Sequence, residues 1–206
     1  SGATSINGRL TADICLNACG EGESVLKADG TLNGDGSNFT QWTPIGTVEK
    51  PYEGTFDGNG KRISGLYFSD EDVNYVGLFK YNEGIVQNVG VVDSYIRGRY
   101  YVGGVVGCNK GTINNVYNTG TVSGFEYVGG VVGQNAGGVR MVYNAGAVTG
   151  DKRIGGVVGY NNGDLSNVYN TGTVSGGENV GGVVGFNAGG GTVENAYYNT
   201  DFYAWS

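Results

Sequence analysis

Histidine is absent from this chain of 206 residues, and only two prolines and three cysteines occur. Without histidine, the usual general base and the commonest neutral metal ligand of proteins are both missing. Catalysis would therefore have to rest on carboxylates, lysine, arginine or tyrosine. The three cysteines also provide no four-ligand zinc spacing. We expect no metal, no other cofactor and no catalytic residues.

Charged side chains are scarce as well. They make up 15% of the residues, and 12 basic residues face 19 acidic ones, for a formal charge of −7. A nucleic-acid surface needs clustered lysine and arginine, so no nucleic-acid partner is expected. No apolar run approaches the roughly 18 residues of a membrane-spanning helix, and no signal peptide is recognisable. We expect a processed or trimmed segment with no membrane span.

Glycine, in contrast, is abundant. The chain has 42 glycines and 15 tyrosines, and apolar residues account for 39%. The glycines lack the every-third-residue order of collagen, and the apolar content is sufficient for a packed core. Because the glycines recur at fixed offsets, we interpret them as conformational requirements.

From Tyr101 to the C-terminus the sequence repeats every 26 residues. A fixed period between about 20 and 50 residues is typical of stacked-repeat architectures. Such a stack presents columns of identical side chains, which suit adhesion and display better than chemistry. The repeated positions include Gly103-Gly104, Gly129-Gly130, Gly155-Gly156 and Gly181-Gly182, then Asn109, Asn135, Asn161 and Asn187.

The apolar runs in each unit are short, rich in β-branched residues and bounded by glycine or asparagine, which is typical of strands. No segment has helical apolar spacing. Three strand segments fit in one unit: Val102–Val106, Thr112–Tyr117 and Thr121–Ser123. We therefore predict an all-β fold, a right-handed parallel β-helix (β-solenoid) with about 26 residues and three strands per coil.

Two aliphatic columns three residues apart are expected to face the core. Because side chains alternate along a strand, a bend must lie between the columns, at Asn115, Asn167 and Asn195. Asparagine tolerates the left-handed conformation of a tight bend, and stacked asparagines can hydrogen-bond along the column. The first column is Ile63, Val86, Ile113, Val139, Leu165 and Val193, the second is Leu66, Val89, Val116, Val142, Val168 and Ala196, and a third is Ile96, Val122, Val148 and Val174.

The predicted organisation is one continuous solenoid over residues 51–206, preceded by an N-terminal capping region, residues 1–50. Residues 20–38 form a Gly-, Asp- and Ser-rich loop, and Arg9–Leu16 and Trp42–Val48 are expected first-coil strands. Terminal units must cover an open end of the core. Cys15 and Cys19 could close a small disulfide or remain two buried thiols, so both alternatives stay open.

Gly104-Val-Val-Gly107 and its equivalents at 130–133, 156–159 and 182–185 resemble the GLUG motif, glycine–leucine–hydrophobic–glycine. This motif occurs in repeats of bacterial surface proteins, including large adhesins and immunoglobulin A-specific metallopeptidases. Here valine replaces the usual leucine, and Gly77-Leu-Phe-Lys80 departs at its last glycine. The resemblance implies an extracellular location, on the bacterial cell surface or secreted. It brings no catalytic residues, since His-Glu-x-x-His is absent.

The bend places the following tyrosines on the outside. Tyr117, Tyr143, Tyr169 and Tyr197 form an outward stripe in this prediction, with Tyr67 as a candidate member. Aligned aromatic side chains could contact a sugar ring or an apolar patch of another protein. Alternatively, they could stack on one another and stabilise the sheet. The stripe is our candidate ligand-contact surface, with a glycan or a host protein as partner.

Two other sets of polar residues are candidates for a catalytic site or a calcium site. Parallel β-helices also include polysaccharide lyases and hydrolases, for which carboxylates and arginine would be needed. The spacing of Asp57 and Asn59 is reminiscent of a calcium loop but lacks its remaining ligands, so a tight turn is the better interpretation. The candidate catalytic set for an enzyme is Asp70, Glu71, Asp72, Asp93, Arg97 and Arg99.

The sequence therefore favours an extracellular bacterial surface or adhesin module that acts in binding, in adhesion or as a structural stalk. The alternatives are a polysaccharide-active enzyme of the same fold and a filament subunit. In the filament, exposed strand edges at the ends of the solenoid would associate end to end.

Overall fold

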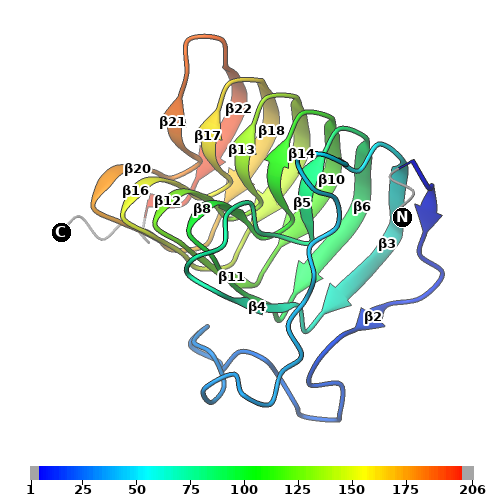
Figure 1. Ribbon diagram of the computed structural model, residues 1–206. Helices are drawn as coiled ribbons and strands as arrows, with labels where there is room; N and C mark the ends of the chain where they lie inside the picture. The colour runs from blue at the N-terminus through cyan, green and yellow to red at the C-terminus, as the bar shows by residue number, and fades with distance from the viewer. Residues whose placement is uncertain (1–4, 201–206) are drawn as a thin grey trace.

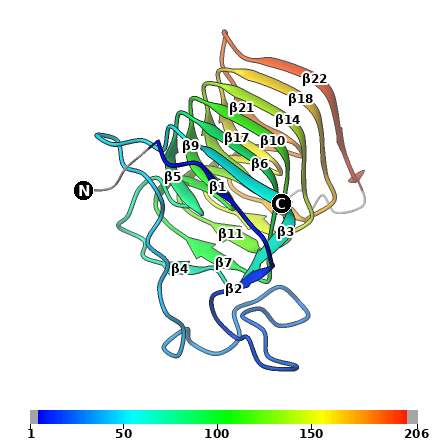
Figure 2. The ribbon, with the colours of Figure 1, turned by 90° about the vertical axis from the view of Figure 1, so that its right-hand side faces the viewer.

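A computed structural model describes residues 5–200. The chain winds into a stack of parallel strands of about six turns, with roughly 26 residues per coil, and residues 5–200 contain no α-helix. Figures 1 and 2 show successive coils as a colour series from cyan to red. The predicted all-β parallel solenoid is confirmed. Right-handed winding stays a prediction, based on the general preference of parallel crossovers.

The strands form four sheets, which we number I to IV. Sheet I is the broad face of the stack, and its strands from β3 to β22 lie side by side in Figure 1. It consists of β1 (Gly8–Arg9), β2 (Ile14–Cys15), β3 (Thr55–Ser64), β6 (Ile85–Val92), β10 (Thr112–Asn118), β14 (Gly138–Asn144), β18 (Asp164–Asn170) and β22 (Thr192–Tyr198).

The other three sheets have shorter strands. Sheet II contains β4 (Tyr67–Ser69), β7 (Tyr95–Arg97), β11 (Thr121–Ser123), β15 (Val148–Thr149) and β19 (Val174–Ser175). Sheet III contains β8 (Tyr100–Gly103), β12 (Glu126–Gly129), β16 (Lys152–Gly155) and β20 (Glu178–Gly181). Sheet IV contains β5 (Phe79–Asn82), β9 (Val106–Asn109), β13 (Val132–Asn135), β17 (Val158–Asn161) and β21 (Val184–Asn187).

The prediction of three strands per coil is wrong, because a full coil contributes to all four sheets. The segment predicted as one strand, Val102–Val106, is divided between β8 and β9. Val105 and Val106 are both fully buried, although they are adjacent. Neighbours on a regular strand point to opposite faces, so the chain must bend between these two residues. Because the residues on both sides of this corner are apolar, the sequence pattern did not indicate it.

The inward columns on sheet I are largely confirmed. Ile113 pairs with Val86 and Val139, and all three are buried. At the C-terminal end of the column Val193 is 39% exposed, because no described strand covers β22. The third column is buried as predicted, at Ile96, Val122, Val148 and Val174.

Ile63 and Leu66 are buried but lie in other columns than predicted. Phe56 pairs with Val86, whereas Ile63 pairs with Val91, five residues further along β6. The register of β3 shifts between Asp57 and Lys61. A β-bulge adds residues to one strand only, so counting along the sequence places every later residue in the wrong column.

The bend inside each long strand is confirmed. Asn115, Asn167 and Asn195 have φ of 54°, 54° and 51°, and Met141 adopts the same conformation with φ of 52°. The Asn115 side-chain amide donates to Asn88 Oδ1 over 2.8 Å, and Asn195 donates to Asn167 over 3.1 Å. Met141 interrupts this ladder because it has no amide group.

Two further asparagine ladders lie inside the molecule. Asn109 donates to Asn135 Oδ1 over 2.9 Å, and Asn135 donates to Asn161 over 2.8 Å. A second ladder joins Asn118 to Asn144 over 3.0 Å. Each of these side chains is buried, so its hydrogen bonds replace those that water would make.

Close packing explains both glycines of the Gly-Val-Val-Gly segment. A Cβ on Gly130 would lie 2.3 Å from Cγ of Asn144, which belongs to the second buried ladder. A Cβ on Gly133 would lie 2.4 Å from the carbonyl carbon of Tyr101 in the preceding coil. Lys80 replaces the equivalent glycine near the N-terminal end of sheet IV, where β5 is the terminal strand.

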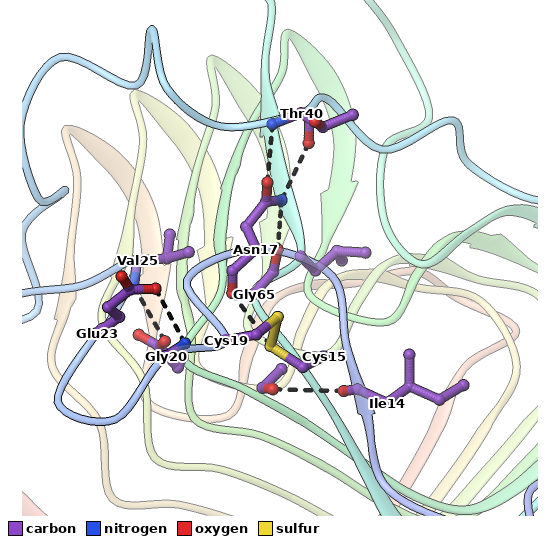
Figure 3. Close-up of a disulfide and its surroundings, with 12 residues drawn as sticks. Ile14, Cys15, Asn17, Cys19, Gly20, Glu23, Val25, Thr40 and Gly65 are labelled. Carbon is purple, nitrogen blue, oxygen red and sulfur yellow. Dashed lines mark hydrogen bonds between the residues drawn. A yellow bond between two sulfur atoms is a disulfide. The ribbon is translucent and has the colours of Figure 1, made fainter.

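The N-terminal part of the chain lies against the first coils. The structure joins Cys15 and Cys19 in a disulfide, drawn in Figure 3. The same figure shows Asn17 held between two segments, with its amide donating to the carbonyl oxygens of Thr40 and Gly65 over 3.0 and 2.8 Å. Only the two short strands β1 and β2 occur in residues 5–54.

The predicted loop, residues 20–38, returns to the solenoid. Asp93 accepts hydrogen bonds from the hydroxyl of Ser24 and from the backbone amides of Val25 and Leu26, over 2.5, 3.0 and 2.9 Å. Thr121 of sheet II donates to the carbonyl oxygen of Gly30 over 2.6 Å. The loop therefore lies along the outer side of sheet II.

Candidate functional site

The predicted tyrosine stripe is assembled on sheet I. The rings of Tyr117 and Tyr143 are parallel, with centroids 4.8 Å apart and an interplanar angle of 3°. Tyr143 and Tyr169 repeat this arrangement at 4.9 Å and 5°. Tyr197 pairs with Tyr169 in the next strand and is 65% exposed. Two steps of 26 residues and a last step of 28 thus align the four predicted tyrosines on adjacent strands.

Tyr67 is not part of the stripe, which corrects the prediction. It lies in sheet II, is buried, and stacks on Tyr95 with a centroid distance of 6.2 Å. The position next to Tyr117 is occupied by Gly90. A Cβ on Gly90 would lie 2.1 Å from Cζ of Tyr117, so the ring of Tyr117 covers this glycine.

Stacking determines which parts of these rings a partner could reach. Tyr143 has a neighbouring ring on each side, so its two faces are directed at Tyr117 and Tyr169. Burial first, and then these two neighbours, raise the pKa of Tyr143. The accessible parts are ring edges and hydroxyl groups, which can form hydrogen bonds but offer no broad face for sugar stacking.

A second ladder of stacked aromatic rings was not predicted from the sequence. It lies on sheet III and on the preceding segment, which pairs with β8 of that sheet. Tyr75, Tyr101 and Tyr127 stack at centroid distances of 4.7 and 4.6 Å, with interplanar angles of 3° and 2°. Their φ angles are 58°, 59° and 60°. The equal sequence spacing of the three residues was the available signal.

Arg153 ends this ladder. Its guanidinium carbon lies 5.1 Å from the ring centroid of Tyr127 and 5.4 Å from that of Phe186. The same guanidinium group forms an ion pair with Glu126. Cation–π contacts of this kind stabilise a half-buried cation, so we interpret Arg153 as the terminal member of the stack.

Cys108 and Tyr81 lie next to this ladder, on sheet IV. Burial raises the pKa of the Cys108 thiol, and burial, followed by the contact with Cys108, raises the pKa of Tyr81. A buried thiol with a raised pKa is a poor nucleophile. Cys108 is therefore a packing residue in this arrangement.

The six candidate catalytic residues are not brought into one site. Asp93 binds the N-terminal loop, as described above. Glu71 forms an ion pair with Arg97. Asp70 accepts a hydrogen bond from the backbone amide of Asp72 over 3.0 Å, as in a simple turn. Glu71, Arg97 and Arg99 line a groove of about 480 Å³ at the corner between sheets II and III.

Asp57 and Asn59 form no calcium site in the structure. They lie in the bulge of β3, not in a turn between strands, and Asn59 has φ of 53°. Asp57 accepts hydrogen bonds from the backbone amide of Asn59 and the side chain of Asn88, over 2.8 and 3.0 Å. The hydrogen bond from the Asn88 side chain, and then that from the Asn59 backbone amide, lower the pKa of Asp57. Across residues 5–200, no group of three or more metal-binding side chains occurs.

Comparison with known families identifies the repeat. The GLUG motif matches residues 98–123 and 150–175, two alternate 26-residue units of the stack. The predicted resemblance is confirmed: the chain carries GLUG-motif repeats. The first residue of each matched unit, Gly98 or Gly150, is one of the glycines that line the groove described above.

Two curated proteins are similar to parts of the chain. One is a candidate Gly-rich membrane protein of Evansella cellulosilytica, 39% identical over 80 residues, which are 36% of this chain and 9% of that protein. The other is halomucin of Haloquadratum walsbyi, 40% identical over 118 residues, which are 56% of this chain and 1% of that protein. The chain thus spans less than a tenth of the length of either relative.

Among solved structures, a candidate immunoglobulin A1 protease from Bacteroides ovatus is similar, with a TM-score of 0.58. The match covers 94% of this chain and 68% of that one, at 20% sequence identity. This likeness supports a shared fold. In the part of this chain that the structure describes, no helix is both long and apolar enough to cross a bilayer.

Proposed function

We propose that this chain, which carries GLUG-motif repeats on a parallel β-solenoid, is a stiff spacer module of a longer protein at the outer surface of a bacterial cell, or secreted from it. The names of two similar proteins, a Gly-rich membrane protein and halomucin, support a surface role. Their much greater lengths support a module within a larger chain.

The observation that carries the spacer role is the unbroken axial pairing. Each strand of sheet I from β3 to β22 pairs in parallel with the next coil. Buried asparagines and stacked tyrosines connect the same coils along the axis. No linker interrupts the stack between residues 55 and 198. A solenoid held in this way resists bending between coils, since each coil is bonded to both neighbours.

Surface exposure is tested on intact cells of the source organism with antibodies raised against the purified chain. We expect labelling of unpermeabilised cells or recovery of the antigen in the medium. Labelling that appears only after permeabilisation, with none in the medium, would refute the location.

Adhesion through the tyrosine stripe is a second candidate function. It is favoured by the alignment of Tyr117, Tyr143 and Tyr169 along one face of sheet I. Because both ring faces of Tyr143 are occupied, a glycan or host protein would bind the hydroxyl edge of this residue. Tyr143→Phe keeps the stack and removes one hydroxyl, so it should weaken binding in a glycan-array and host-matrix screen. Binding that is unchanged in Tyr143→Phe and in Tyr143→Ala would dismiss this role.

A further inference from the structure

The groove between sheets II and III lies apart from the tyrosine stripe and from the second aromatic ladder. The floor of the groove is formed by backbone atoms of glycine residues. Gly98, Gly124 and Gly150 occupy equivalent positions in three successive coils. A Cβ on Gly124 would lie 2.8 Å from Cγ2 of Val102, and one on Gly150 would lie 2.5 Å from Cδ1 of Ile154. A Cβ at either glycine would be directed at these buried core side chains, so backbone atoms form the floor of the groove.

The walls of the groove combine charge and an aromatic surface. Arg97 forms an ion pair with Glu71, whereas Arg99 forms no ion pair within residues 5–200. The guanidinium of Arg99 lies 5.1 Å from the ring centroid of Tyr100. Two arginines thus face one carboxylate among the lining residues, and the groove retains a positive charge on a chain whose formal charge is −7.

Phe125 supplies an exposed aromatic surface in the groove. Its ring meets that of Tyr100 edge to face, at 5.7 Å and 85°, and Phe125 is 44% exposed. In a perpendicular pair only one ring presents its face to the other. The groove therefore offers exposed aromatic surface beside a cation, whereas Tyr143, in the middle of the tyrosine stripe, has both ring faces covered.

We propose that this groove binds an acidic saccharide, with a sugar carboxylate or sulfate paired with Arg99 and a sugar ring against Phe125. Arginine binds carboxylates and phosphate-like oxyanions through two parallel hydrogen bonds, and a cavity of about 480 Å³ is within the usual range for small ligands. The inference deepens the surface role proposed above, and rests on it because the groove must be reachable from outside the cell.

The test is calorimetric titration of the purified chain with four probes: an oligogalacturonate, a sulfated heparin oligosaccharide, a neutral malto-oligosaccharide and polyglutamate. We expect at least one of the two acidic saccharides to bind, more weakly as salt rises, and the other two probes to bind at least tenfold more weakly. Which acidic saccharide binds distinguishes a carboxylate from a sulfate ligand.

Variants localise the binding. Arg99→Ala, Phe125→Ala and Thr149→Trp, the last of which fills the groove without changing charge, should each weaken binding at least tenfold. Arg140→Ala is the matched control, because Arg140 is an exposed arginine on sheet I. Circular dichroism and melting temperature establish that each variant folds.

The proposal is overturned if neither acidic saccharide binds, if polyglutamate or the neutral sugar binds as tightly, or if Arg140→Ala weakens binding as much as Arg99→Ala. Each of these results leaves the cell-labelling experiment unaffected. Failure of the groove is therefore distinguishable from failure of the surface role.

Discussion

At the scale of single residues, the backbone of this protein repeatedly adopts positive φ at non-glycine positions. One such column crosses sheet I at Asn88, Asn115, Met141 and Asn167, with φ between 52° and 55°. Asparagine enters this conformation at lower cost than most residues, and the amides of Asn115 and Asn195 also donate to the preceding coil. Met141 keeps the conformation without either advantage.

We therefore expect Met141→Asn to stabilise the protein. The new amide would lie between Asn115 and Asn167, and relief of backbone strain contributes about 1 kcal/mol. Thermal unfolding should show a melting temperature about 2–4 °C higher. Met141→Ala is the control, because it removes the exposed thioether without supplying an amide. An Asn variant that melts no higher than the Ala variant would contradict the argument.

For Asn135, in the buried asparagine ladder, we expect the opposite effect, because substitution should destabilise the protein. Its carboxamide accepts from Asn109 and from the backbone amide of Gly137, and donates to Asn161. Asn135→Ala leaves these buried groups unpaired, at about 1–3 kcal/mol each, so we expect a loss of at least about 2 kcal/mol in denaturant unfolding. Asn162→Ala, at an exposed neighbouring position, should change stability by no more than about 0.5 kcal/mol. Equal effects of the two substitutions would disprove a special role for the ladder.

At the scale of elements, the unit of the fold is one coil, with a strand in each of four sheets. Strand registers repeat from coil to coil, as in the pairing of Val116 with Val142 and of Val142 with Val168. Because each coil contacts chiefly its neighbours, the stability of the stack is approximately a sum over coils and interfaces. The period is thus a physical constraint on insertions and deletions.

Removing one complete period should preserve the fold. Deletion of residues 124–149 joins Ser123 to Gly150, which is equivalent to Gly124, so each column continues in register. We expect a folded, slightly less stable protein with unchanged β-sheet circular dichroism.

Deletion of residues 124–148 is the matched control, since it removes one residue fewer. It places Thr149 on the glycine floor and moves core-facing side chains out of register, so we expect loss of cooperative unfolding. If both deletions fold equally well, the coil is not the structural unit.

At the scale of the whole molecule, the two ends differ. At one end, β1 and β2 pair with β3 of sheet I, and the bridging residues Ile45 and Tyr52 pair with β5 of sheet IV. At the other, no described strand pairs with the outer edges of β19 to β22. End-to-end association stays a proposal, and repeated head-to-tail stacking would require the N-terminal residues to move aside. Sedimentation at increasing concentration tests this, and a strictly monomeric species would count against it.

The aromatic content makes stability sensitive to alkaline pH. Burial is the main cause of a raised pKa in several tyrosines, including Tyr95, Tyr101 and Tyr127. Because the folded-state pKa exceeds the unfolded value of about 10, the neutral form stabilises the fold. This contribution is complete below pH 10 and is lost as pH rises through the folded-state values.

We expect phenolate absorbance of the native protein to rise above pH 10 together with loss of β-sheet circular dichroism. In denaturant the same tyrosines should titrate near pH 10. If these tyrosines ionise at the same pH in the native protein as in denaturant, burial does not protect their side chains.

The sequence by itself determined the period, the parallel stack, the aliphatic columns and the asparagine bends, because each coil has the same neighbours and so requires the same side chains. It could not determine the corner between Val105 and Val106, where both neighbours are apolar, or the bulge in β3 that moves Ile63 to another column. Tertiary structure alone decided the contacts that the repeat does not specify. It assigned Asp93 to the N-terminal loop, covered both ring faces of Tyr143 and left Arg99 beside Phe125 in an open groove. These arrangements depend on contacts between segments far apart in the chain, which periodicity does not specify.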